Sequence, residues 1–288
     1  GRQQYDRYID HAVINKSTYI YNMYPETDEL HREKIQNHAV TYIGSLVPTK
    51  GFHVLAAVWK TILKEVPDAT LNVVGNGKLY GRNSKLGKYN IAEDSYEKQF
   101  MSGLTDDEGN ILPSVHFWGV LGVEKNDVIR NTCVGVVNPT GRTETFGISA
   151  LDFESMSVPV VTIAKGGFLD TVLNEKTGLL YGHTDDFAKD IIMLLKNDKL
   201  NEQYGRDGVQ LCKKFTPDKI IKEWNRLFLK VLNDEKMEYI EPDSFMETNL
   251  KKYRCLNRKI KNAIGVEYPI SVIGAESFAR NVLRRMGK

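Results

Sequence analysis

Residues 39–74, AVTYIGSLVPTKGFHVLAAVWKTILKEVPDATLNVV, decide the fold of this chain. Ala39–Ile43 is a short apolar run that ends at a glycine, and residues 71–74 form a second such run. Between them, residues 51–66 repeat apolar side chains at helical spacing and stop before Pro67. The stretch therefore predicts a strand, a helix and a second strand parallel to the first.

Short apolar runs alternate with helical patterns along the rest of the central sequence. We predict strands at residues 115–117, 134–137, 159–163 and 178–181, and helices at residues 96–104, 147–157, 184–195 and 201–214. This alternation predicts an α/β fold, a Rossmann-like, doubly wound parallel sheet with helices on both faces. Ligands bind beyond the carboxyl ends of the strands in such sheets. We therefore expect convergence there of the glycine-bearing loops at residues 44–51, 75–77, 141–147 and 165–167.

The composition changes at both ends of this pattern, which divides the chain into three parts. Residues 1–37 are polar and irregular, with one short predicted strand at residues 19–23. Residues 38–233 are predicted to form the Rossmann-like domain, and residues 234–288 a basic helical extension. Within the domain, residues 78–114 are long for an α/β connection, so we expect an insertion or a mobile loop with one helix.

Charge and cysteine content exclude several classes of protein. The net charge of the 288 residues is +2, but residues 251–288 alone carry ten Lys or Arg and two Asp or Glu. A uniformly basic surface is therefore excluded, and we expect no nucleic-acid partner. Three widely spaced cysteines form neither a disulfide framework nor a zinc site and suit a reducing compartment. We therefore expect a cytoplasmic location.

The basic C-terminal tail combines an apolar stripe with cations. Phe278, Val282, Leu283 and Met286 fall on one helical face, with Arg280, Arg284 and Arg285 beside it. Two interpretations stay open. The helix either packs on its own protein or makes a peripheral contact with anionic lipid at the inner face of the membrane.

The first loop with chemical potential is residues 44–51, GSLVPTKG, between a strand and a helix. The N-terminus of a helix presents free N–H groups and partial positive charge, which suit a phosphate, and Lys50 adds a full charge. The alternative is a plain turn with a solvated lysine, and the spacing alone does not decide between them.

The second such loop is residues 138–154, NPTGRTETFGISALDFE, which also joins a strand to a helix. Carboxylates accept hydrogen bonds from vicinal hydroxyls, so Glu144 and Asp152 could hold the two sugars of a nucleotide-sugar, with backbone amides facing its diphosphate. The alternative makes Glu144 a partner of the helix dipole and Asp152 a surface residue. The residues alone favour the alternative.

Four segments together resemble family 4 of the retaining glycosyltransferases. Residues 44–51 are similar to its G-R-x4-K-G loop, residues 74–77 (VGNG) to its V-G-x-G turn, residues 144–161 to its E-x7-E and P-V-V element, and residues 166–180 to its G-G-x-x-E…T-G-x-L element. The likeness runs from about residue 39 to 230. It implies the GT-B architecture, two Rossmann-like domains across a cleft, of which these residues correspond to the C-terminal, donor-binding domain.

The resemblance also implies roles for individual residues. Lys50 would contact the donor diphosphate, Glu144 the transferred sugar and Asp152 the ribose hydroxyls, and we name Glu144 and Lys50 as catalytic. The implied donor-binding set is Gly44, Ser45, Lys50, Gly51, Gly75, Gly77, Arg142, Glu144, Thr145, Phe146, Gly147 and Asp152.

The chain departs from the family pattern at several positions. Ser45 replaces an arginine, and Asp152 and Asp170 each replace a glutamate. Arg142 could supply the missing charge, or it is an exposed loop residue. About 37 residues precede the first matched strand, whereas a complete enzyme has an N-terminal acceptor domain. We expect either the C-terminal half of a longer enzyme or a naturally short chain.

The expected function is a retaining, metal-independent hexosyltransferase that uses a nucleoside-diphosphate sugar and an unknown acceptor, in surface polysaccharide or glycoconjugate synthesis. This chain would be mainly the donor-binding part, and an isolated half is expected to bind donor but to turn it over poorly. The sequence has no D-x-D motif, so we expect neither a metal nor a cofactor. One alternative is a non-catalytic nucleotide-sugar-binding module. The other alternative, an NAD-type oxidoreductase, is disfavoured because Gly75 and Gly77 are not followed by the third glycine of a dinucleotide-binding G-x-G-x-x-G motif.

Overall fold

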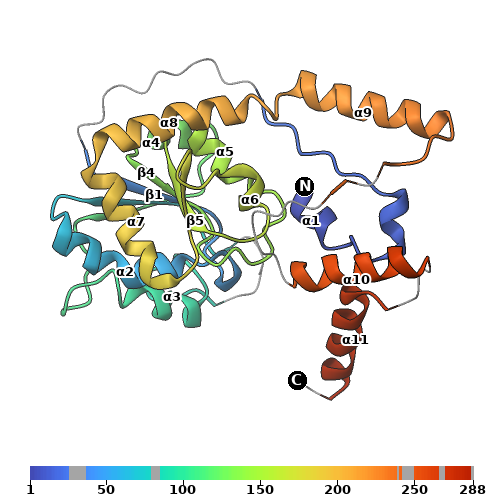
Figure 1. The fold of residues 1–288 in the computed structure, drawn as a ribbon. Coiled ribbons are helices and arrows are strands. Elements are labelled where there is room, and N and C mark those ends of the chain that lie inside the picture. The colour runs from blue at the N-terminus through green and yellow to red at the C-terminus, as the bar shows by residue number, and fades with distance from the viewer. Residues whose placement is uncertain (26–36, 79–84, 239, 242–249, 266–269, 287–288) are drawn as a thin grey trace. The chain divides into compact units, whose positions relative to one another are not determined.

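The computed structural model describes residues 1–25, 37–78, 85–238, 240–241, 250–265 and 270–286, which fall into two compact units (Figure 1). Residues 24–216 form the first, here called the sheet unit. Residues 1–23 and 217–288 form the second, here called the helical unit. The sheet unit thus begins and ends earlier in the chain than the predicted domain of residues 38–233.

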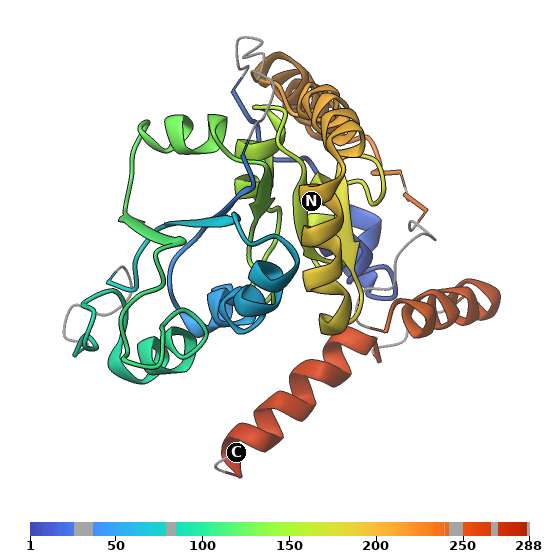
Figure 2. The ribbon, with the colours of Figure 1, turned by 90° about the vertical axis from the view of Figure 1, so that its left-hand side faces the viewer.

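The centre of the sheet unit is a parallel sheet of six strands within the described residues (Figure 2). These are β1 (Ala39–Ile43), β2 (Thr70–Val74), β3 (Val115–Gly119), β4 (Val134–Val136), β5 (Val160–Ile163) and β6 (Gly178–Tyr181). Their spatial order is β3-β2-β1-β4-β5-β6, and every pair is parallel. From β1 the chain adds β2 and β3 on one side, and it then adds β4, β5 and β6 on the other side. The order of the strands thus reverses between β1 and β4, which confirms the predicted doubly wound fold.

Helices cover both faces of this sheet. They are α2 (Phe52–Glu65), α3 (Asp94–Met101), α4 (Lys125–Arg130), α5 (Ile148–Glu154), α6 (Phe168–Thr171), α7 (Thr184–Lys196) and α8 (Asp198–Cys212). α2, α3 and α7 share one hydrophobic core with the strands. α5 packs against β4, β5 and α8, and right-handed crossovers put it on the opposite face.

The apolar spacing that predicted α2 also explains its packing. Phe52, Leu55, Trp59 and Ile62 follow one another at helical intervals, and each is fully buried. Burial of such a side chain contributes about 1.5–3 kcal/mol. This face holds α2 against the sheet and fixes the loop that precedes it.

The predicted strand at residues 19–23 is wrong, because the structure has no regular secondary structure there. Tyr19 packs through its ring, 5.7 Å from that of Tyr5, and not through a backbone ladder. The helix in the predicted insertion is confirmed as α3; residues 79–84 lie outside the described part. Glu97 of α3 orders the segment before it, since its buried carboxylate accepts hydrogen bonds from the backbone N–H groups of Tyr89, Ile91 and Ala92.

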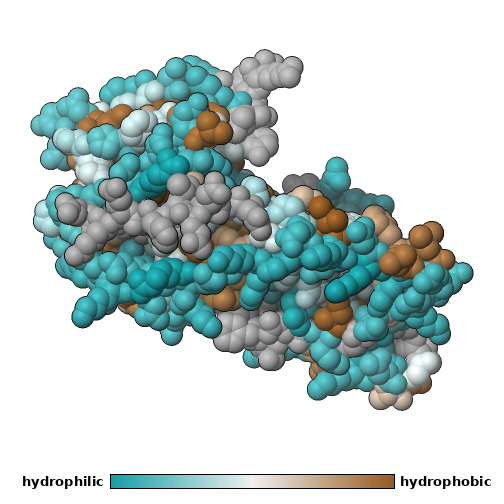
Figure 3. All heavy atoms as spheres, turned by 90° about the horizontal axis from the view of Figure 1, so that it is seen from above, coloured by the Kyte–Doolittle hydropathy of each residue, from teal (hydrophilic) through white to brown (hydrophobic). Residues whose placement is uncertain are grey.

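The helical unit contains α1 (Arg2–Asp6), the 3-10 helix η1 (Ala12–Lys16), α9 (Pro217–Leu232), α10 (Lys251–Ile264) and α11 (Val272–Arg285). Trp224, Phe228 and Leu232 of α9 are exposed, and Figure 3 shows apolar residues on a mostly hydrophilic surface. Among the described residues, no helix combines the length and the apolar content that a membrane span requires.

Glu154, at the end of α5, is a fully buried carboxyl group in the sheet unit. The hydroxyl of Thr177 donates a hydrogen bond of 2.6 Å to Oε1, and Oε2 has no hydrogen-bond partner among the described residues. Its stem lies against Gly208 of α8, where a Cβ would come within 3.1 Å of it. Burial raises the pKa of Glu154 well above its ordinary value of 4.5, and the bond from Thr177 lowers it less.

We expect Glu154→Gln to stabilise the fold increasingly as the pH rises above 4.5, the pKa of an unperturbed glutamate. With a raised pKa the folded state keeps a proton that the unfolded chain has lost. Stability therefore falls by about 1.4 kcal/mol per pH unit up to the pKa of the folded state. Glutamine does not titrate and still accepts the bond from Thr177. Urea unfolding at pH 5 and pH 8, with Glu108→Gln as an exposed control, measures the effect; a pH-independent difference from the wild type would contradict it.

Candidate functional site

The loop between β1 and α2 holds Lys50 at the carboxyl edge of the sheet. The buried hydroxyl of Tyr42 donates a hydrogen bond of 2.9 Å to the carbonyl of Lys50. Gly44 and Gly75 touch, because a Cβ on Gly75 would lie 2.0 Å from the Gly44 carbonyl oxygen. Gly51, with φ of 72°, then turns the chain into α2. The glycines therefore fix the course of the loop by close approach and by backbone conformation.

The loop between β4 and α5 orients both oxygens of Glu144. The side-chain amide of Asn138 donates to Oε2 (3.2 Å) and to the carbonyl of Arg142 (3.0 Å). The backbone N–H of Gly147 donates to Oε1 (3.2 Å). Asn138 was not among the predicted site residues, although its place directly after a strand is the signal that could have identified it.

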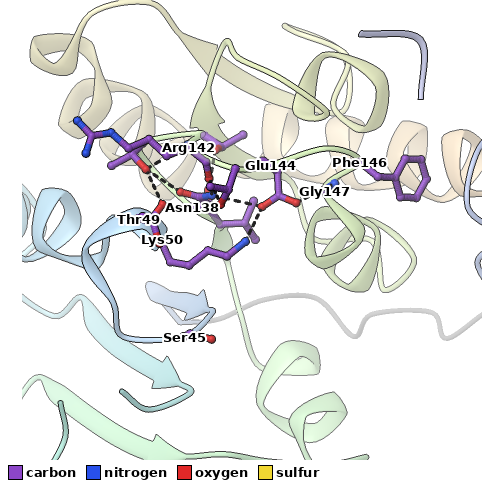
Figure 4. Close-up of polar contacts among 12 residues, drawn as sticks. Ser45, Thr49, Lys50, Asn138, Arg142, Glu144, Phe146 and Gly147 are labelled. Carbon is purple, nitrogen blue, oxygen red and sulfur yellow. Dashed lines mark hydrogen bonds and ion pairs between the residues drawn. The ribbon is translucent and has the colours of Figure 1, made fainter. Parts of the chain in front are cut away.

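The two loops meet, which confirms the prediction that they share one edge of the sheet (Figure 4). Lys50 Nζ lies 3.0 Å from Glu144 Oε2, and the Thr140 hydroxyl donates to the carbonyl of Thr49 (2.9 Å). The side chains of Lys50 and Glu144 are 27% and 14% exposed. A cation and a carboxylate from separate loops therefore form an ion pair that is partly exposed to solvent. The pair lies beyond the ends of β1 and β4, where the order of the strands reverses.

The loop after β5 supports the loop that carries Glu144. A Cβ on Gly166 would lie 2.6 Å from the Glu144 carbonyl oxygen, and one on Gly167 would lie 2.3 Å from the Phe146 nitrogen. The N–H of Gly167 donates to the Glu144 carbonyl (3.1 Å). Backbone packs directly on backbone here, which accounts for the paired glycines.

Asp152, on α5, has polar partners of its own. Lys125 Nζ of α4 lies 2.7 Å from Oδ2, and the hydroxyl of Tyr24 donates to Oδ1 (3.1 Å). Burial, and secondly the charge of Asp152, raise the pKa of Tyr24, so the phenol keeps its proton. Lys125 and Tyr24 were missed because the sequence carries no signal that joins either position to Asp152.

The remaining predicted site residues play different parts. Arg142 is exposed and its guanidinium is directed away from the Lys50–Glu144 pair (Figure 4). Phe146 is buried, with its ring 5.3 Å from that of Phe215. Ser45 is partly buried and lies apart from the pair, and Thr145 is exposed.

Arg142 also acts on its neighbourhood. The pKa of His53, in the first turn of α2, is lowered by desolvation and then by the Arg142 guanidinium. Imidazole Nδ1 of His53 lies 3.1 Å from the Tyr96 hydroxyl.

Gly77 is buried, and a Cβ there would lie 2.7 Å from the Cα of Ala92, so this glycine allows the loop after β2 to pack closely. Within the described part of the chain, no three His, Cys, Asp or Glu side chains are grouped as a metal site.

Comparison with known proteins gives one family. The family model described as "Glycosyl transferases group 1" matches residues 26–210. An uncharacterized glycosyltransferase of Methanocaldococcus jannaschii is 25% identical over 215 residues, which are 74% of this chain and 53% of that protein. The capsular polysaccharide biosynthesis glycosyltransferase CapM of Staphylococcus aureus is 26% identical over 63% of this chain and 43% of its own length. The chain thus spans about half the length of these relatives.

A solved structure shares the fold of this chain. A mutant of S. aureus TarM, crystallised with Fondaparinux, alpha-GlcNAc-glycerol and UDP, superposes with a TM-score of 0.58 at 20% identity. The match covers 73% of this chain and 39% of TarM.

Proposed function

The chain belongs to the family of glycosyl transferases group 1, and on that premise we propose that it binds the donor of a sugar transfer. The donor is a nucleoside-diphosphate sugar, and the reaction is a metal-independent hexosyl transfer with retention, as in family 4. The acceptor belongs to surface polysaccharide or glycoconjugate synthesis.

The ion pair between Lys50 and Glu144 carries this proposal. It lies at the carboxyl edge of β1 and β4, the point where doubly wound sheets bind ligands. Lys50 supplies a cation for the diphosphate, and Glu144, held by Asn138 and Gly147, supplies an oriented acceptor for sugar hydroxyls. The solved complex of TarM contains UDP, and CapM is named for capsular polysaccharide biosynthesis, which support the substrate class.

Catalysis in this proposal is electrostatic. As the bond from sugar to diphosphate breaks, negative charge develops on the diphosphate beside Lys50, and a fixed cation stabilises it without reorganisation. Asp152 holds the ribose hydroxyls. In the free protein its charge is neutralised by Lys125, so nucleotide binding exchanges or shares that partner.

A non-catalytic nucleotide-sugar-binding module is the second candidate. The observation in its favour is that Asp152 is already satisfied by Lys125 and Tyr24, and that Ser45 brings no charge to the diphosphate. Both candidates predict donor binding, and only the first predicts turnover.

Isothermal calorimetry of this chain against UDP-, GDP- and ADP-sugars and against NAD tests the class of ligand. We expect one nucleotide-sugar series to bind and NAD not to bind. Binding of NAD alone would reject both candidates. If the chain binds a donor, release of free sugar or transfer to an acceptor supports the enzyme. Because the chain spans about half the length of its relatives, absence of turnover supports the module once an N-terminal acceptor domain has been restored.

A further inference from the structure

Helix α10 buries its charged side and exposes its apolar side, the reverse of an ordinary surface helix. Its buried side chains are Lys251, Arg254, Arg258 and Lys261. Its exposed apolar side chains are Tyr253 (64%), Leu256 (56%), Ile260 (41%) and Ile264 (57%).

The buried cations are held by specific partners within the helical unit. Lys251 Nζ lies 3.0 Å from Asp6 Oδ2, and Lys261 Nζ donates to the Asp10 carbonyl (2.6 Å). Arg254 bridges the Arg7 carbonyl (2.8 Å) and the carboxylate of Glu276 on α11 (2.7 Å). Turning α10 to bury its apolar side would strip these charges of their partners at a cost of several kcal/mol. The outward apolar side is therefore fixed by the packing of the cations.

Helix α11 presents a second apolar stripe, which the sequence predicted. Phe278, Val282, Leu283 and Met286 are exposed by 72%, 38%, 47% and 65%, so a large part of this stripe is open to solvent. Arg280, Arg284 and Arg285 are exposed as well. On the exposed side of α10, Lys252 and Lys259 flank the apolar residues in the same way.

We propose that α10 and α11 dock on an anionic lipid surface. The apolar stripes enter the boundary between headgroups and acyl chains, and the exposed cations contact lipid phosphates. Charge complementarity selects this occupant: the exposed charged side chains of the two helices are Lys252, Lys259, Arg280, Arg284 and Arg285, all cations, and a bilayer with acidic headgroups offers apolar depth and negative charge together. This inference concerns the helical unit alone, so it stands or falls separately from donor binding.

Flotation of the full chain with vesicles tests this surface. Two vesicle compositions are compared, pure phosphatidylcholine and phosphatidylcholine with about 30% phosphatidylglycerol, whose headgroup is anionic. We expect the chain to partition to the anionic vesicles at least about tenfold more strongly than to the neutral ones, because each Lys or Arg near the surface adds to the attraction. We expect about 0.5 M NaCl to abolish this difference, because salt screens the attraction.

Two variants with the same change of charge separate insertion from simple attraction. Phe278→Glu places a carboxylate in the apolar stripe of α11, whereas Asn281→Glu places it on the polar side between arginines. We expect Phe278→Glu to weaken partitioning at least about tenfold and Asn281→Glu to weaken it only a few-fold. Circular dichroism confirms that both variants are folded. Equal losses in the two variants would overturn insertion, and no binding of the wild type to anionic vesicles would overturn the proposal as a whole.

Discussion

Replacing Lys50 by alanine is expected to weaken binding of a nucleotide-sugar about 10- to 100-fold. A hydrogen bond to a charged group contributes about 1.5–3 kcal/mol, and 1.4 kcal/mol is a factor of ten in the dissociation constant. In the wild type Lys50 Nζ lies 3.0 Å from Glu144 Oε2, so the variant also removes the cation that neutralises Glu144. The unneutralised carboxylate then repels the diphosphate. Calorimetry with the donor measures the loss, and Lys60→Ala, an exposed lysine on α2, is the matched control.

A double variant separates the two origins of this loss. If Lys50 binds the diphosphate directly, Lys50→Ala combined with Glu144→Gln stays nearly as weak as Lys50→Ala alone. If Lys50 only neutralises Glu144, the double variant recovers most of the wild-type affinity, since the repulsive charge is gone. Full recovery, or wild-type affinity in Lys50→Ala, would contradict the assigned role of Lys50.

The fold could be predicted because its determinants are local. The apolar residues of α2 repeat at helical spacing, Gly44 follows β1, and Gly178 begins β6, so the sequence itself marks these elements and their boundaries. The strand expected at residues 19–23 failed for a non-local reason. Alternating aromatic residues suit a strand, but here Tyr19 packs its ring against Tyr5 and no neighbouring strand pairs with the backbone.

The candidate site could be predicted only as far as sheet topology reaches. Strand ends converge by rule, so the meeting of Lys50 and Glu144 follows from their positions after β1 and β4. Side-chain geometry follows no such rule. Arg142 is directed away from the pair, and Lys125, from a helix with no apolar repeat to mark it, reaches Asp152.

Glu144→Gln is expected to reduce sugar transfer by about 100- to 1000-fold while binding of UDP stays the same or tightens. The carboxylate now accepts from Lys50 and Asn138 on one oxygen and from Gly147 on the other. Glutamine has a single oxygen, so one of these donors, or a sugar hydroxyl, would face an NH₂ group. Removal of a negative charge beside the diphosphate does not weaken the binding of UDP.

Measurement of both quantities on one preparation makes the outcome decisive. Calorimetry with UDP reports the nucleotide site, and release or transfer of radiolabelled sugar from the donor reports the chemistry, with Glu175→Gln as an exposed control. Parallel loss of UDP binding and transfer would mean that Glu144 shapes the loop as a whole and does not act on the sugar. A wild-type chain that binds UDP tightly yet turns over no donor, with an acceptor added and an N-terminal acceptor domain restored, would favour the non-catalytic module, because both reactants must be held together for transfer.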